Sequence, residues 1–170
     1  MKKNILFIAL SLVVGSTVLT SCKKGENDPF LSLKSRDARI TELWKLTKVE
    51  GNTNNNGTLS TDAYDGTIWT STFGSFNSQY AYSLSIEIKK DGTYQSTENN
   101  DGEITTTDGR WYWSNSAKNK TTITLDYLGT FEVNGLKSKE LILKDYSKEV
   151  VSGTSTDSYE STTLMTFEKQ

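Results

Sequence analysis

The chain has 170 residues, a formal net charge of −2 and no histidine. Without imidazole it has no histidine metal ligand, Ser-His triad or Cys-His pair, and its acidic balance argues against a nucleic-acid partner, whose phosphates need a basic surface. Its single cysteine excludes an intramolecular disulfide framework.

The first 21 residues have the organisation of a cleaved signal peptide. Lys2 and Lys3 precede an uncharged, largely apolar run from Ile5 to Leu19, which is shorter than the roughly 20 residues that a membrane-spanning helix needs. The run ends in the sequence LTSC, with the cysteine at position 22. This order resembles the lipobox of bacterial lipoproteins, which implies cleavage after residue 21 and lipid attachment at Cys22. Two or three acyl chains would then form a durable anchor, because each buried CH₂ contributes about 0.8 kcal/mol.

A polar segment separates this anchor from the rest of the chain. Residues 22–29 (CKKGENDP) contain the only proline and are expected to form a tether, which leaves residues 30–170 for one domain. Lys23, directly after the cysteine, points to the outer membrane, with the periplasmic face and the cell surface both open. Apolar residues spaced between Phe30 and Leu43 predict a short helix. The polar run Asn52–Gly57 (NTNNNG) is expected to be a loop.

From residue 44 onward the pattern is typical of β-strands. Apolar and polar residues alternate strictly in the segment 80–89, and Asp-Gly and Asn-Gly pairs recur between runs rich in threonine and tyrosine. Such pairs favour tight hairpins, because both turn residues adopt positive φ. The predicted strands are Trp44–Glu50, Thr67–Phe73, Tyr80–Lys90, Thr93–Glu98, Glu103–Trp113, Thr121–Tyr127, Lys139–Lys148 and Tyr159–Lys169, and a short ninth strand at Thr130–Val133 is left open.

The fold class expected from these strands is all-β. About eight sequential antiparallel strands can close on themselves and so leave no exposed edge. The sequence therefore predicts an antiparallel up-and-down barrel with a short N-terminal helix. A two-sheet β-sandwich is the alternative.

Three parts of the chain resemble the lipocalin-like lipoproteins of the Bacteroidota. They are the segment DPFLSLKSR (28–36) with LWKL (43–46), the segment GRWYW (109–113) before ITL (123–125), and the closing pair LIL (141–143) and LMTF (164–167). The resemblance implies a lipocalin-like barrel with a small calyx for an apolar or amphipathic ligand, and it implies no reaction. It also implies that Trp44 plugs the closed end of the barrel.

Aromatic residues are the candidates for ligand binding. They are Trp69, Tyr80, Tyr82, Trp111 and Trp113. Tyr80 and Tyr82 lie on the apolar face of their strand, and Trp111 and Trp113 share one face of theirs. Each pair either fills the core or lines a cup, since an eight-stranded barrel has room for side chains or for one small ligand.

No motif for catalysis, a metal or a cofactor stands out. The segment 97–108 echoes a calcium loop, but it lacks the acid at the first position and the glutamate at the twelfth. We therefore expect a ligand-binding or carrier barrel without catalysis, metal or cofactor, held at the outer membrane by lipid on Cys22. The alternative is a cell-surface interaction or glycan-binding module. Inward tryptophans would favour the first function, and an exposed row of aromatic residues the second.

Overall fold

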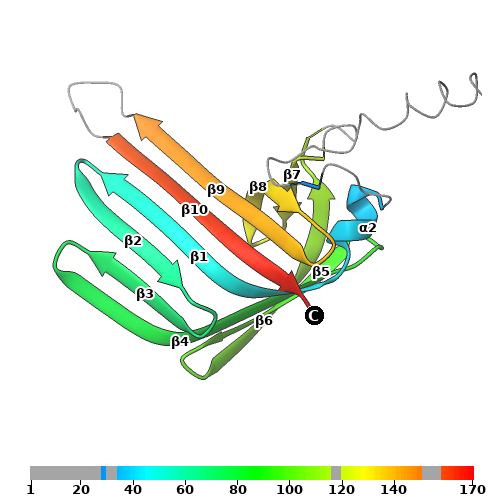
Figure 1. The fold of residues 1–170 in the computed structure, drawn as a ribbon, viewed down its shortest axis with the longest axis horizontal. Helices are drawn as coiled ribbons and strands as arrows, with labels where there is room; N and C mark the ends of the chain where they lie inside the picture. Colours follow the sequence, from blue (N-terminus) through cyan, green and yellow to red (C-terminus); the bar gives the residue numbers. More distant parts are fainter. Residues whose placement is uncertain (1–27, 30–33, 116–119, 151–157) are drawn as a thin grey trace, which may run out of the picture.

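The computed structural model describes residues 28–29, 34–115, 120–150 and 158–170, so the predicted cleavage site and Cys22 lie outside the described residues. A short helix, α2 (Arg36–Ile40), is followed by ten strands (Figure 1). The strands are β1 (Leu43–Asn55), β2 (Thr58–Tyr64), β3 (Ile68–Phe73), β4 (Phe76–Ile88), β5 (Thr93–Asn100), β6 (Glu103–Trp113), β7 (Thr122–Leu125), β8 (Gly129–Leu136), β9 (Glu140–Val150) and β10 (Ser158–Lys169). All of these elements lie within the mature chain expected from residue 22 onward.

The strands close into an antiparallel barrel in the order β1-β10-β9-β8-β7-β6-β5-β4-β3-β2. The predicted barrel and short helix are therefore confirmed, and the sandwich is excluded. The expected number of about eight strands is too low. β2 was not predicted, and residues 52–55, expected as part of a loop, continue β1. Residues 52–55 are all polar, and in β2 the apolar Leu59 and Ala63 are exposed, so neither segment shows the alternation by which half-buried strands are recognised.

The number of strands differs between the two ends of the barrel. Near α2, β1 pairs directly with β4, through Leu43 with Glu87 and Trp44 with Ile86. From Val49 onward β1 pairs instead with β2, because the β2–β3 hairpin is inserted between β1 and β4. Eight strands thus surround the end beside α2, which we name the closed end. All ten contribute only toward the opposite, open end.

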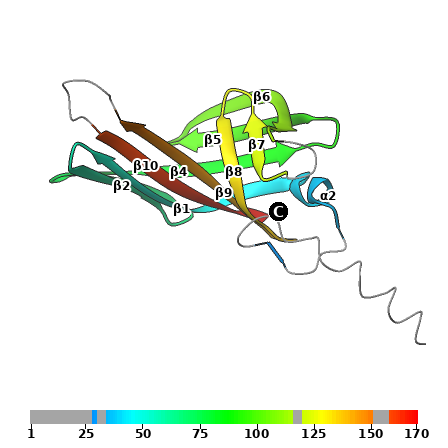
Figure 2. The same ribbon diagram turned by 90° about the horizontal axis from the view of Figure 1, so that it is seen from above.

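The wall of the barrel has two heights. The turn between β5 and β6 reaches only as far as Ala81, whose carbonyl accepts a hydrogen bond from the backbone N–H of Asp101 at 2.8 Å. The turn after β7 stops lower still, beside Arg110, where the N–H of Asp126 donates at 2.9 Å. We name β5–β8 the low wall and β1–β4, β9 and β10 the tall wall. Figures 1 and 2 show the tall wall extending beyond the low one, away from α2.

The hydrophobic core lies at the closed end. Trp44 is fully buried there, and its indole N–H donates to the carbonyl of Ile40 at 2.8 Å, so its predicted place in the core is confirmed. The inward side chains around it come from every strand except β3 and β6. The buried apolar residues are Ile40, Trp44, Leu46, Val49, Tyr64, Ile86, Ile88, Tyr94, Ile123, Leu125, Val133, Leu136, Leu141, Leu143 and Phe167. Full burial of such a side chain contributes about 1.5–3 kcal/mol.

A buried ion cluster joins α2 to the closed end. Arg36 Nη1 lies 2.5 Å from a carboxylate oxygen of Asp28, and Arg39 Nη2 lies 3.8 Å from it. The other oxygen of Asp28 accepts from the backbone N–H of Leu136 at 2.8 Å, while Arg39 donates to the carbonyl of Leu136. Asp28 falls in the segment predicted as a tether, yet it is buried and packs as part of the folded domain.

Gly109 shows that an Asp-Gly pair does not always form a turn. Asn56-Gly57 and Asp101-Gly102 have positive φ at both residues, as tight hairpins require. Gly109 instead lies inside β6, where it faces the ring of Tyr94. A Cβ at position 109 would stand only 2.6 Å from Tyr94 Cε1. Glycine is needed here because the buried tyrosine packs directly on the backbone of β6.

Candidate ligand-binding site

A cavity of about 260 Å³ lies between the two walls, above the filled closed end. Most of its lining is apolar and comes from β4, β7, β8, β9 and β10. The lining residues are Leu84, Ile86, Leu125, Leu128, Phe131, Leu143, Asp145, Thr163, Met165 and Phe167. Asp145 and Thr163 are the polar members, and the Asp145 side chain is exposed to solvent. The cavity therefore offers apolar surface with one carboxylate and one hydroxyl at its rim.

Strand register places two contrasting rows of side chains across the inner face of the tall wall. The row level with the cavity is Tyr80, Trp69, Tyr64, Val49, Met165 and Leu143. The next inner-face row toward the open end is Ser78, Ser71, Asp62, Gly51, Thr163 and Asp145. We name these the apolar row and the polar row. Because side chains alternate between faces along each strand, both rows point into the barrel.

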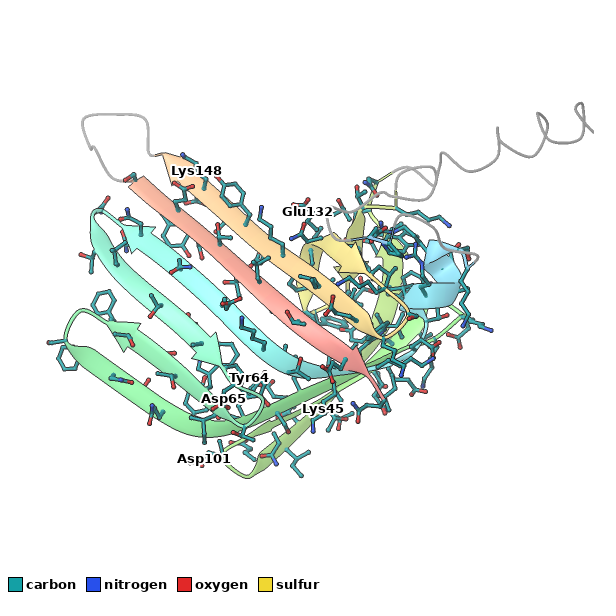
Figure 3. The ribbon with its side chains drawn as sticks, in the orientation of Figure 1. Lys45, Tyr64, Asp65, Asp101, Glu132 and Lys148 are labelled. Carbon is teal, nitrogen blue, oxygen red and sulfur yellow. The ribbon has the colours of Figure 1, made fainter. Side chains whose placement is uncertain are left out.

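Four rings form an aromatic cluster at the β2–β4 side of these rows. Tyr64, Trp69, Tyr80 and Tyr82 have neighbouring ring centroids between 5.1 and 6.4 Å apart, with edge-to-face, tilted and stacked contacts. Figure 3 marks Tyr64 at the end of β2, and its hydroxyl donates to the carbonyl of Tyr82 at 2.9 Å. Aromatic pairs with such geometry contribute about 0.5–1.5 kcal/mol beyond area burial.

The polar row holds the aromatic cluster in place through Asp62. The indole N–H of Trp69 donates to Asp62 Oδ1 at 3.2 Å and to Ser71 Oγ at 3.0 Å. The Ser71 hydroxyl donates to the same carboxylate oxygen at 2.5 Å. These bonds fix the orientation of the indole ring on the inner face.

Neighbouring carboxylates help to raise the pKa of two tyrosines of the cluster. Burial, and then the charge of Glu98 and a hydrogen bond with it, raise the pKa of the Tyr82 phenol well above its ordinary value. Burial together with the charges of Asp62 and Glu98 also raises the pKa of Tyr80. Both effects favour neutral phenols. Asp62 and Glu98 thus lie close enough to these phenols to disfavour their anionic form.

The structure divides the five predicted binding residues into two groups. Trp69, Tyr80 and Tyr82 meet in the aromatic cluster, joined by Tyr64, which sequence reasoning missed because it ends an unpredicted strand. Trp111 and Trp113 lie apart from the cluster, toward α2, and their rings contact each other edge-to-face at 6.0 Å.

Each of these two tryptophans is engaged with the closed end. Trp111 donates to the carbonyl of Lys89 at 2.7 Å, and Trp113 donates to Asp37 of α2 at 2.7 Å. The guanidinium of Arg36 lies 5.6 Å from the Trp113 ring centroid, within cation–π range. Their geometry fits the packing of α2. Ligand binding by any of the five stays a prediction.

Two properties of the described part of the chain bear on the site. It contains no group of three or more acidic, histidine or cysteine side chains that could hold a metal ion. None of its helices has the length and apolar character needed to cross a membrane.

Comparison of the chain with protein-family models, curated proteins and solved structures finds no match. The resemblance to lipocalin-like lipoproteins therefore stays a prediction.

Proposed function

We propose that the protein is an outer-membrane lipoprotein, anchored by lipid on Cys22, whose lipocalin-like barrel binds a small apolar or amphipathic molecule without catalysis. The observation that carries this proposal is the inner cavity of about 260 Å³. Pockets for drug-sized ligands measure about 300–1,000 Å³. The cavity therefore suits a small molecule, or the apolar end of a longer one.

The lining of the cavity supports an amphipathic ligand. An apolar cavity binds water poorly and apolar groups well, and each buried CH₂ of a ligand contributes about 0.8 kcal/mol. Asp145 and Thr163 would meet the polar end of such a molecule at the rim. Because β7 and the turn after it are short, this rim opens sideways above the low wall.

The buried position of Asp28 supports a defined orientation on the membrane. Six Cα–Cα steps of at most about 3.6 Å each join Asp28 to position 22, so a lipid anchor there would be tethered within about 22 Å of Asp28. The 13 residues of β1 extend about 43 Å toward the open end. The closed end would then face the membrane that carries the lipid, and ligand would enter from the aqueous side.

Glycan binding is the second candidate, favoured by the aromatic cluster beside the hydroxyls of the polar row. It ranks second because the tryptophans lie on the inner face, where Trp44 is buried and the other three are half-buried. The most exposed aromatic residues do not form one row. Phe73 and Phe76 pair at the β3–β4 hairpin, whereas Tyr112 lies on β6 and Tyr127 in the turn after β7.

The test uses the chain from residue 22 with Cys22→Ser, which contains every described element. Native mass spectrometry would detect a ligand that co-purifies from source cells, and the neutral dye N-phenylnaphthylamine would measure binding to the emptied protein. Met165→Trp should fill the cavity and abolish binding. Leu164→Trp is the matched control, because it adds the same ring to the opposite face of β10.

The possible results separate the two functions. Loss of dye binding in Met165→Trp, but not in Leu164→Trp, with both variants folded by circular dichroism, supports the proposal. A wild-type protein that carries no ligand and takes up no dye contradicts it. Oligosaccharide binding that Trp69→Ala abolishes and Met165→Trp leaves intact would establish the glycan function instead.

A further inference from the structure

The charges on the described strands are separated by face. On the inner face the ionised side chains of the walls are carboxylates: Asp62, Glu98, Glu103, Asp145 and Glu149. The exception is Lys169, which lies at the closed end and pairs with Glu42 at 2.5 Å. The other strand cations are on the outer face, at Lys45, Lys48, Arg110, Lys144 and Lys148. The outer face also carries acids, so only the inner face above the closed end has strand charges of one sign.

Three of the inner carboxylates lie around the candidate site. Asp145 lines the cavity rim. Asp62 accepts hydrogen bonds from Trp69 and Ser71. Glu98 forms a hydrogen bond with the phenol of Tyr82. Among the described residues, no lysine or arginine lies within ion-pair distance of these three carboxylates. Within the described part of the chain no ion pair balances these charges, and carboxylates of this kind attract positive charge.

Gly51 brings two members of the polar row together. A Cβ at position 51 would stand 3.2 Å from Asp62 Cβ and 3.3 Å from Thr163 Oγ1, so glycine lets these neighbours approach each other over the backbone of β1. Asp145 follows Thr163 in the same row. Only small residues separate Asp62 from Asp145, three strand spacings or about 14 Å apart along the sheet. Both carboxylates therefore lie in one row on the inner face of the tall wall, with Asp145 at the rim of the cavity.

We propose that the ligand is an organic cation, an amphipath whose ammonium group lies at the carboxylate-lined rim while its apolar part enters the cavity. This inference rests on the proposed function and adds the charge of the ligand. The aromatic cluster supports it, because the faces of tryptophan and tyrosine attract ammonium groups within about 6 Å. An anionic amphipath, such as a fatty acid, would meet like charge at the same rim.

Three probes with one apolar chain and different head groups test the inference. Decyltrimethylammonium, decanol and decanoate, each below the concentration at which it aggregates, would displace N-phenylnaphthylamine from the chain that begins at residue 22 with Cys22→Ser. We expect decyltrimethylammonium to bind more tightly than decanol, and decanoate to bind more weakly than decanol. The preference for the cation should weaken as ionic strength rises to about 0.5 M, because salt screens exposed charges.

Two inner-face variants and one outer-face control locate the effect. Asp145→Asn should lower the affinity for decyltrimethylammonium by about two- to fivefold, as expected for an exposed charge pair, and leave decanol binding unchanged. Asp62→Asn keeps an oxygen that can accept from Trp69 and should add to this loss. Asp108→Asn is the matched control, because it removes the same charge from the outer face of β6.

The outcomes distinguish this inference from the proposed function. A cation preference that falls in both inner-face variants and persists in Asp108→Asn supports the inference. Equal binding of all three head groups, or tightest binding of decanoate, overturns it and leaves the barrel as a binder of amphipaths. Equal losses in all three variants overturn it too, since net charge alone would then explain the preference. Failure of every probe and of the dye to bind overturns the proposed function itself.

Discussion

Asp28→Ala tests whether Asp28, eight residues before Arg36, is part of the folded domain. The carboxylate contacts Arg36 at 2.5 Å, lies 3.8 Å from Arg39 and accepts from the N–H of Leu136 at 2.8 Å. All three charged side chains are buried. Its removal would leave two guanidinium groups without a counter-charge and one backbone amide without an acceptor. The Nε atoms of both arginines already lack a hydrogen-bond partner, so the cluster has no spare acceptor to compensate.

The expected loss of stability follows from these contacts. Removing one partner of a buried ion pair costs about 3–5 kcal/mol, and a buried N–H left without an acceptor costs about 1–3 kcal/mol. Water entering the space would offset part of the sum. We therefore expect the free energy of unfolding to fall by about 3–5 kcal/mol, a large share of the roughly 5–15 kcal/mol of an ordinary domain.

Urea unfolding, followed by tryptophan fluorescence, measures this loss in the chain that begins at residue 22. Glu50→Ala is the control, because it breaks an exposed ion pair with Lys48 at 2.9 Å and should cost less than about 1 kcal/mol. In the double variant Asp28→Ala/Arg36→Met one unpaired charge is gone, so its loss should be smaller than the sum of the single losses. An effect of Asp28→Ala no larger than that of Glu50→Ala would refute the role of Asp28 in the folded domain.

Three further predictions concern packing and pH. Trp113→Ala should cost roughly 2–4 kcal/mol of unfolding free energy, slightly below the range for a fully buried tryptophan, without weakening dye binding in the folded fraction. Gly109→Ala should lower the free energy of unfolding by about 1–3 kcal/mol, because the added methyl group displaces Tyr94. A thermal unfolding midpoint equal to that of the wild type would contradict this. The hydroxyl and the N–H of Thr93 lower the pKa of Asp91 below its ordinary 3.8. The stabilisation from this lowered pKa is therefore complete above about pH 4 and is lost as pH falls through the lowered value. Asp91→Asn should make the free energy of unfolding less dependent on pH in that acid range. If urea unfolding at several pH values gives the same dependence as in the wild type, the lowered pKa of Asp91 does not contribute to stability.

The fold was predictable where one face of a strand is buried. The core half of β4 shows the strict alternation from which it was identified, and β9, whose inner residues Leu141 and Leu143 are buried, was also predicted. β2 was missed because its inner face carries the polar Ser60 and Asp62, while the apolar Leu59 and Ala63 are exposed on its outer face. It belongs to the upper part of the tall wall, where no opposing strand covers the inner face, so burial does not select apolar residues there.

The candidate site was predictable only in part. Alternation assigns a residue to the inner face, but it does not give its height along the barrel axis. Trp111 faces inward beside Leu125 near α2, whereas Trp69 lies far from the closed end beside Tyr64. Separating these tryptophans requires the register of the intervening strands. The gathering of carboxylates on the inner face above the closed end depends on the same register, and no local motif around Asp145 indicates it.

Stability and ligand binding depend on different parts of the barrel. The buried ion cluster and most of the apolar core lie at the closed end, where eight strands surround them. The polar row, next to the apolar row toward the open end, consists of small and acidic side chains, and the β2–β3 hairpin widens the barrel. Residues such as Asp145 and Met165 stand at the boundary, on strands held in register by backbone bonds. Changes to them should therefore alter the ligand with little loss of stability, whereas changes around Asp28 should affect stability first.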